Sequence, residues 1–152
     1  MKHWIKLFVA LATSAAFVMT TGAFAFANGS QTDGTTVAVA KSRLGRILVD
    51  SKGITLYDFV TDKAGVSGCY GACAALWPPL ITKGKPQAGH GVRASLLGTT
   101  KRKDGKLQVT YAGHPLYTFA GDTQPGQTTG EGSNGFGAPW WVVTPAGKAL
   151  QN

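Results

Sequence analysis

The sequence predicts an all-β fold, and three observations support this class. The ten residues from Gly53 to Asp62 recur sixty positions later as Gly113 to Asp122, with Gly, Leu, Tyr, Phe and Asp at matching offsets. Short apolar runs alternate with Gly and Asp turns, and no amphipathic helix of useful length appears. Two pseudo-repeats of short antiparallel strands therefore predict a small sandwich or barrel with one short helix.

Each copy of the repeat reads as a turn, a strand and a second turn. Because side chains alternate along a strand, Tyr57 and Phe59 share one face and Leu56 takes the other. Tyr117 and Phe119 are placed in the same way in the second copy. Neither copy can bury its aromatic face alone, so the two copies are expected to pack on each other.

The motif Tyr-x-Phe-x-x-Asp, present twice, resembles the secreted-repeat family of unknown function. Members of that family are also described as predicted lipoproteins with a Tyr-x-(Phe/Trp/Tyr)-x-x-Asp motif. The first copy continues into a cysteine-containing segment that ends in Trp77-Pro78-Pro79-Leu80, which is similar to the family pattern. The resemblance spans roughly Arg43 to Gly147, as one repeat over about 43–81 and another over about 103–147. It implies an exported protein and no settled biochemical role.

Residues 1–27 have the pattern of a signal peptide. Two lysines precede an apolar run from Leu7 to Phe26, and Ala25-Phe26-Ala27 is a small-x-small cleavage site. The alternative is an uncleaved membrane anchor, because the run is nearly long enough to span a bilayer. No cysteine follows the run, unlike in the lipoprotein-like relatives. A secreted or periplasmic protein without lipid modification or a stable membrane anchor is expected.

Cleavage after Ala27 leaves 125 residues with a net charge of +6. Residues 28–36 are rich in Gly, Ser and Thr and predict a flexible lead-in. Residues 37–152 then form a single domain. The basic charge is assigned to solubility, with no nucleic-acid partner, because Lys101-Arg102-Lys103 is the only tight basic run. That run precedes Asp104-Gly105 and is expected to be a charged hairpin tip.

The first half is expected to contain three strands and one helix. Strands are predicted over 37–40 and 47–50, and 54–60 is expected to pair back on the second of these as a hairpin. Residues 72–77 predict a short helix that ends at two prolines. The Gly-rich segment 82–91 is expected to connect the two halves.

The second half is expected to be a hairpin unit followed by a long loop and a last strand. Asp104-Gly105 is a hairpin signal, and Ala112-Gly113 is a second turn. The predicted elements are an ambiguous strand or helical turn over 92–97, strands over 107–111 and 114–119, a Gly-rich loop over 121–137 and a strand over 140–144.

Cys69 and Cys73 are the only cysteines, and export to an oxidising compartment favours a disulfide between them. The alternative is a redox-active or metal-binding pair, completed by a histidine such as His90 or His114. Neither a Cys-x-x-Cys nor a haem-attachment motif is present, and the histidine spacing does not indicate zinc. No cofactor is therefore assigned, and metal or haem stays an open alternative.

Asp62 and Asp122 occupy equivalent places in the two copies. Two such carboxylates can flank a substrate or hold a cation, whereas the simpler interpretation is that each closes its own turn. No Ser-His-Asp order, nucleophile elbow or phosphate loop is visible, so catalysis ranks below binding.

The function predicted from these patterns is an exported binding or interaction module in the cell envelope or outside the cell, and the patterns do not specify its ligand. Its ligand classes remain carbohydrate, a surface polymer or another envelope protein. A redox or metal accessory protein is the second hypothesis, and an enzyme using the two aspartates is the third. The candidate binding residues are Tyr57, Phe59, Asp62, Trp77, Tyr117, Phe119, Asp122, Trp140 and Trp141. Of the adjacent Trp140 and Trp141, one is expected to be partly exposed.

Overall fold

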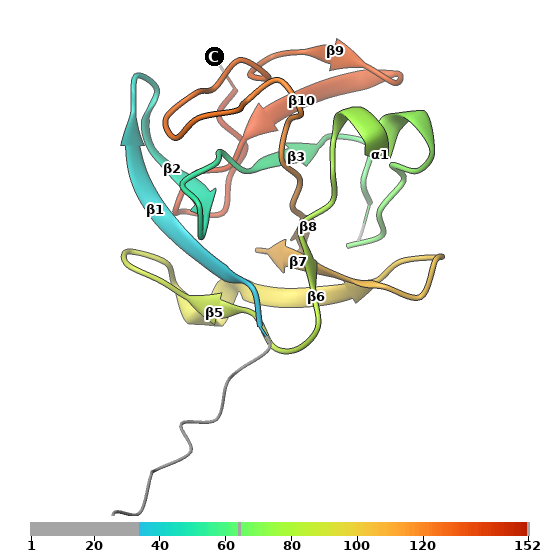
Figure 1. Cartoon of the computed structure of the whole chain (residues 1–152), viewed down its shortest axis with the longest axis horizontal. Helices are drawn as coiled ribbons and strands as arrows, with labels where there is room; N and C mark the ends of the chain where they lie inside the picture. Colours follow the sequence, from blue (N-terminus) through green and yellow to red (C-terminus); the bar gives the residue numbers. More distant parts are fainter. Residues whose placement is uncertain (1–33, 64, 152) are drawn as a thin grey trace, which may run out of the picture.

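The computed structural model describes residues 34–63 and 65–151, so the predicted signal peptide lies outside the described residues. The chain forms short strands with one helix and one helical turn (Figure 1). In order these are β1 (Thr36–Ser42), β2 (Gly45–Asp50), β3 (Tyr57–Phe59), α1 (Ala72–Leu76), β4 (Ile81–Thr82), β5 (Gln87–Ala88), η1 (Ala94–Leu96), β6 (Leu97–Lys101), β7 (Leu107–Tyr111), β8 (His114–Pro115), β9 (Asn134–Gly135) and β10 (Ala138–Val142).

The strands form three small sheets. Their orders are β2-β1-β5, β3-β10-β9 and β4-β7-β6, with β8 paired to β7. Every pair is antiparallel except the two-residue contact between β1 and β5. The predicted all-β class is confirmed, and the strands of the described residues do not close into a barrel.

Two of the predicted hairpins are present and follow from their turn residues. β6 and β7 pair across the Asp104-Gly105 turn, where Gly105 has a φ of 82°. β7 and β8 pair across Ala112 and Gly113, whose φ values are 50° and 83°. Positive φ at both central residues matches the twist of a two-residue hairpin turn.

The hairpin predicted for residues 54–60 is only half correct. Leu56 donates its amide to the carbonyl of Leu48 at 3.0 Å, so the segment does fold back on β2. From Tyr57 onward, however, the chain leaves β2 and pairs with β10, as β3. The segment 82–91 also differs from the expected plain connector, because β5 within it adds to β1.

The last segment of each repeat pairs with the other repeat. β4, at the end of the first repeat, pairs with β7, and β10, at the end of the second repeat, pairs with β3. Two backbone hydrogen bonds show the same exchange. Leu80 donates to Leu116 at 2.9 Å, and Val143 donates to Leu56 at 3.0 Å. Each half of the fold is thus completed by the opposite repeat, so neither repeat is a self-contained unit.

The core has two clusters that follow the predicted strand alternation. Tyr57 and Phe59 lie in one cluster with Tyr117, and Phe119 packs against it. Leu56 and Leu116 lie in the other. The two aromatic faces therefore meet inside the molecule, as expected from the repeat.

Candidate functional site

The centre of the molecule is a pseudo-two-fold junction between the two motif copies. The amide of Tyr57 donates to the carbonyl of Tyr117 at 2.8 Å, and the amide of Tyr117 donates to the carbonyl of Tyr57 at 3.0 Å. Both tyrosines are fully buried. This reciprocal pair relates one copy to the other and places equivalent residues on opposite sides of the junction.

The Tyr and the Asp that each motif copy contains at the same spacing bond across the junction to the opposite copy. The Tyr57 hydroxyl donates to Oδ2 of Asp122 at 2.5 Å, and the Tyr117 hydroxyl donates to Oδ2 of Asp62 at 2.5 Å. Burial is the main cause that raises the pKa of each phenol, and the hydrogen-bonded aspartate adds to it. Both tyrosines therefore stay protonated and act as donors.

The second oxygen of each aspartate closes a local loop. Oδ1 of Asp62 accepts the Gly68 amide at 2.7 Å. Oδ1 of Asp122 accepts the amide and the hydroxyl of Thr129, at 2.9 and 2.6 Å. The turn-closing role expected for the aspartates is thus present, and the bond to the opposite copy's tyrosine is added to it.

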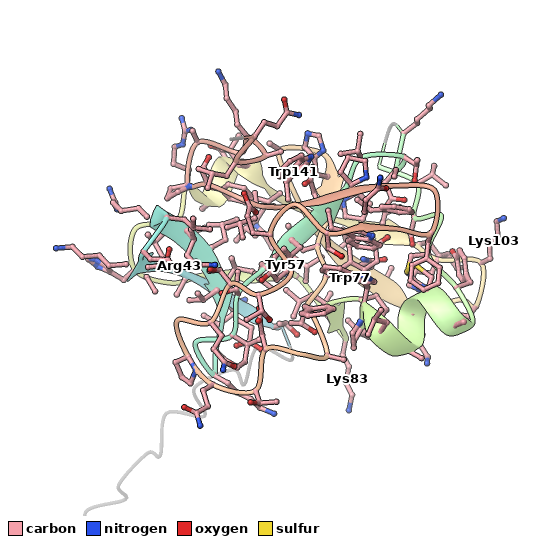
Figure 2. The ribbon with its side chains drawn as sticks, turned by 90° about the horizontal axis from the view of Figure 1, so that it is seen from above. Arg43, Tyr57, Trp77, Lys83, Lys103 and Trp141 are labelled. Atoms are coloured by element: carbon pink, nitrogen blue, oxygen red, sulfur yellow. A yellow bond between two sulfur atoms is a disulfide. The ribbon has the colours of Figure 1, made fainter. Side chains whose placement is uncertain are left out.

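Four of the predicted aromatic candidates form a column in the core. Phe59 stacks on Trp140 at 4.1 Å between centroids, Trp140 on Trp77 at 4.1 Å, and Phe119 tilts against Trp77 at 4.5 Å. Each Phe contacts the Trp of the opposite repeat. Figure 2 shows Tyr57 and Trp77 in the interior, whereas the labelled lysines reach outward. These rings therefore form the framework and leave little exposed area for a ligand.

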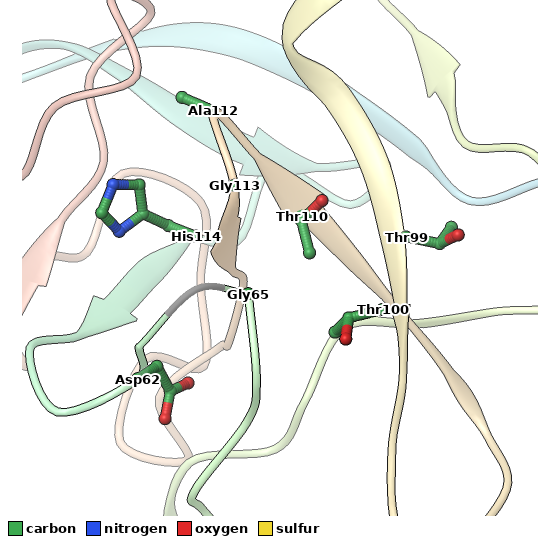
Figure 3. Close-up of a pocket in the computed structure, with 8 residues that line it drawn as sticks. All are labelled: Asp62, Gly65, Thr99, Thr100, Thr110, Ala112, Gly113 and His114. Carbon is green, nitrogen blue, oxygen red and sulfur yellow. The ribbon is translucent and has the colours of Figure 1, made fainter.

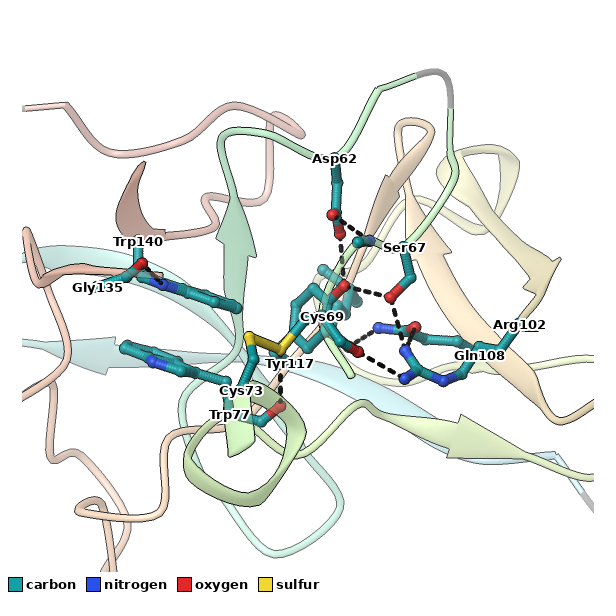
Figure 4. Close-up of a disulfide and its surroundings, with 12 residues drawn as sticks. Asp62, Ser67, Cys69, Cys73, Trp77, Arg102, Gln108, Tyr117, Gly135 and Trp140 are labelled. Carbon is teal, nitrogen blue, oxygen red and sulfur yellow. Dashed lines mark hydrogen bonds between the residues drawn. A yellow bond between two sulfur atoms is a disulfide. The ribbon is translucent and has the colours of Figure 1, made fainter. Parts of the chain in front are cut away.

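The disulfide predicted between Cys69 and Cys73 is present, and both residues are buried. It lies beside Trp77 and below a polar network that runs to Tyr117 (Figure 4). With both sulfurs bonded to each other and covered, a metal or redox role would first require reduction of a buried bridge. The geometry fits a structural bridge that holds the bend before Trp77.

Arg102 corrects the predicted charged hairpin tip. It is 4% exposed, and its guanidinium donates to Oγ of Ser67, to Oε1 of Gln108 and to the carbonyl of Cys69, at 2.7, 2.6 and 2.7 Å (Figure 4). It also lies 4.3 Å from the ring centre of Tyr70. The middle residue of a basic run that looks like a surface segment is thus buried, and its hydrogen bonds connect the β6–β7 hairpin to the loop that contains Cys69.

Two of the positions at which the motif copies differ carry an ionisable residue in one copy only. Asp58 and His114 approach each other, with 3.5 Å between Oδ2 and Nδ1. At the equivalent positions sixty residues away the chain has Thr118 and Ile54, which are not ionisable. The Asp58 side chain is 6% exposed and that of His114 is 45% exposed. We refer to Asp58, Asp62 and His114 as the asymmetric face.

Burial raises the pKa of Asp58 to about 6, while His114 opposes the rise and the charges of Asp62 and Glu131 add to it. Burial likewise raises the pKa of Asp62. Oδ1 of Asp58 is covered and has no hydrogen-bond partner among the described residues. A buried carboxylate oxygen without a donor is costly, so this atom requires an explanation.

Two hollows border the asymmetric face. Hollow 1 has a volume of about 390 Å³ and is lined by Asp62, His114, glycines and three threonines, Thr99, Thr100 and Thr110 (Figure 3). Hollow 2 has a volume of about 380 Å³ and is lined by Asp58, Asp62, His114, Lys148 and neighbouring residues. Figure 3 shows Asp62 and His114 on one side of hollow 1 and the β6 threonines on the other. Asp62 and His114 thus belong to both hollows.

The remaining candidates are not brought together. Asp122 is buried and lines neither hollow. Trp141 is the partly exposed member of the adjacent pair, opposite Asp58 in the β3–β10 register. His90 is exposed near β5. Within residues 34–63 and 65–151, no three His, Cys, Asp or Glu residues are arranged to hold a metal ion.

Sequence reasoning missed Asp58 and underrated His114. A signal was available, because these are the motif positions where one copy carries an ionisable residue and the other does not. Strands β3 and β8 lie side by side at the junction, and this proximity, which brings Asp58 to His114, is not visible in the sequence.

No helix in the part of the chain that the structure describes is long and apolar enough to cross a membrane. A family model described as "Secreted repeat of unknown function" matches residues 38–81 and 98–144, more than half of the chain. The matched segments contain the two motif copies together with the segments that the repeats exchange. No curated protein and no solved structure matches the chain.

Proposed function

This chain belongs to the secreted-repeat family, and from that premise we propose that it is an exported binding module whose ligand occupies the asymmetric face. The residues of the two copies then fall into two groups with different roles. Their shared residues build a rigid junction, and the residues that differ between them form the binding surface. The ligand is an envelope polymer rich in hydroxyl groups.

The observation that carries this proposal is the environment of Asp58. Its Oδ1 lacks a partner among the described residues, although the matching aspartates Asp62 and Asp122 are well satisfied. It borders a hollow, beside a half-exposed histidine. Unpaired buried polar atoms next to a hollow are more typical of a recognition site than of a packed core.

The lining of hollow 1 supports a hydroxyl-rich ligand. Threonine hydroxyls donate and accept hydrogen bonds, and a carboxylate accepts them, so the lining can pair with sugar hydroxyls. An enzyme that uses Asp62 and Asp122 together is disfavoured, because Asp122 is buried and lines neither hollow. The two-carboxylate mechanism would need both groups on one substrate.

Export is part of the proposal, with cleavage of the signal peptide after Ala27. The intact mass of protein collected outside the cytoplasm should correspond to a chain that starts at Asn28. A mass that still includes residues 1–27 would contradict cleavage and support the membrane-anchor alternative.

Binding can be tested by sedimentation with insoluble cell-wall polysaccharide. Thr100 is partly exposed and lines hollow 1 on the same sheet face as Thr110, so Thr100→Trp should fill the hollow and weaken binding by about tenfold, equivalent to about 1.4 kcal/mol. Gln124→Trp, at an exposed position on the second-copy loop, is the matched control. Unchanged binding of Thr100→Trp would contradict the proposal.

A further inference from the structure

The asymmetric face is an acidic site in a basic protein. The whole chain carries a formal charge of +8, yet the residues that line hollow 1 include a carboxylate and no lysine or arginine. Hollow 2 adds the second carboxylate and a single lysine, Lys148. A phosphate or other anion would be repelled from this location by both carboxylates.

The charge state of Asp58 makes a cationic partner favourable. With a pKa of about 6, the carboxylate is mainly ionised at neutral pH. Its Oδ2 lies 3.5 Å from Nδ1 of His114, and its Oδ1 has no donor among the described residues. A ligand that supplies both positive charge and N–H donors would satisfy the buried oxygen and neutralise the site.

We propose that the group recognised at the asymmetric face is a primary ammonium, bound between Asp58 and Asp62. Asp58 and Asp62 line hollow 2 together, and Asp62 also lines hollow 1 beside three threonines, so the site offers oxygen acceptors for the three N–H donors of an ammonium. A metal ion is less suited, because no three protein ligands are arranged for one among the described residues. This inference rests on the proposed function of the same face and specifies its ligand class.

His114 lines both hollows and lies beside Asp58, so an ammonium that approaches this carboxylate comes next to the imidazole. The imidazole is half-exposed, and its 3.5 Å contact with Asp58 is long for a hydrogen bond, so rotation breaks no strong interaction. Asp58→Asn should lose the interaction, because the neutral amide no longer attracts a cation.

The test compares two sugar hexamers that differ only in the amine. Calorimetry at neutral pH should give binding to the glucosamine hexamer and at least tenfold weaker binding to the N-acetylglucosamine hexamer, a difference of about 1.4 kcal/mol or more. A short lysine peptide is the second source of the same group. Tighter binding of the peptide than of the amino sugar would identify a protein-derived ammonium as the ligand.

The variants decide whether the asymmetric face is responsible. Asp58→Asn should weaken binding of the amine probe by at least about tenfold. Asp104→Asn removes the same charge from an exposed hairpin position, and Thr118→Ala changes the equivalent position of the other copy, so both should bind normally. Circular dichroism melts verify that each variant is folded.

The outcomes separate this inference from the proposed function. Equal binding of both hexamers, with loss in Thr100→Trp, would overturn the ammonium inference and leave the binding face in place. Equal binding by Asp58→Asn and the unmodified protein would also overturn it. If no amine probe binds, the inference is wrong, and the polysaccharide sedimentation decides the proposed function independently.

Discussion

The two sides of the central junction share a framework but differ in their surroundings. Each side has a buried tyrosine that donates to the opposite aspartate, and a Phe that packs on the opposite Trp. On one side only, an ionisable pair is added, which joins Asp58 of the first copy to His114 of the second. The shared residues are explained by folding alone, so the residues that differ are the better place to look for function.

The loops that follow the two aspartates differ in the same way. The loop after Asp62 contains a disulfide, helix α1 and the buried Arg102 contacts. The loop after Asp122 has six glycines over residues 121–137 and no cysteine. The first loop is therefore covalently cross-linked, whereas the second is held by hydrogen bonds, among them those of Asp122 to Thr129 and of Thr55 to the carbonyl of Gln127.

The largest expected difference between the copies concerns their phenylalanines. Phe59 is 4% exposed and stacks on Trp140, whereas Phe119 is partly exposed. Phe59→Ala should lower the free energy of unfolding by about 3–5 kcal/mol, as for other buried phenylalanines, and Phe119→Ala should lower it less. Urea unfolding measures both. Equal losses would show that the two sides of the column pack equally well.

The second prediction concerns pH and Asp58. Its pKa is raised from 3.8 to about 6 in the folded protein, so the folded state binds more protons than the unfolded state between these values. Stability contributed by protonated Asp58 is therefore present below about pH 4 and lost as pH rises through about 6, at a cost of roughly 1–3 kcal/mol.

Asp58→Asn should remove this pH dependence and stabilise the protein at neutral pH. Because Asp62 also has a raised pKa, the informative quantity is the difference between the variant and the unmodified protein across the pH range. Thr118→Ala, at the equivalent position, should leave the pH dependence unchanged. Parallel stability curves for Asp58→Asn and the unmodified protein would contradict the assignment.

The fold was predictable to the extent that local patterns decide it. Strand alternation correctly separated Tyr57 from Leu56, and the Asp104-Gly105 and Ala112-Gly113 turns formed hairpins. The exchange of β4 and β10 between repeats was not predictable, because the composition of short, similar strands does not specify which strand each one pairs with.

The candidate site was less predictable, since it depends on long-range proximity. Asp58 and His114 are distant in sequence and meet only through the junction. Arg102 lies between two lysines, and nothing local distinguishes it from them. Its burial results from the acceptors that Ser67, Gln108 and Cys69 provide.

The third prediction concerns the cross-link that only the first loop has. Replacing Cys69 and Cys73 together by Ala should lower the free energy of unfolding by about 2 kcal/mol, the value expected for so short a loop. The unmodified exported protein should show no free thiol under denaturing, non-reducing conditions. Two free thiols would contradict the bridge and favour the redox alternative.

The last prediction tests the crossed pairing that defines the junction. If the Tyr57 hydroxyl serves Asp122, the effects of Tyr57→Phe and Asp122→Ala on the free energy of unfolding should be non-additive by roughly 1.5 kcal/mol, the low end for a hydrogen bond to a charged group. Tyr57→Phe and Asp62→Ala belong to the same motif copy but share no bond, so they should add.

The equivalent pair, Tyr117 and Asp62, allows the same coupling to be compared between the two sides of the junction. Tyr117→Phe should couple to Asp62→Ala, but less strongly, because the Tyr117 hydroxyl also lies 2.7 Å from Oγ of Ser67 and Asp62 is more exposed than Asp122. Urea unfolding of the single and double variants measures each coupling. Coupling within a motif copy rather than across copies would mean that the copies fold as separate units, and the framework assigned to the junction would then be wrong.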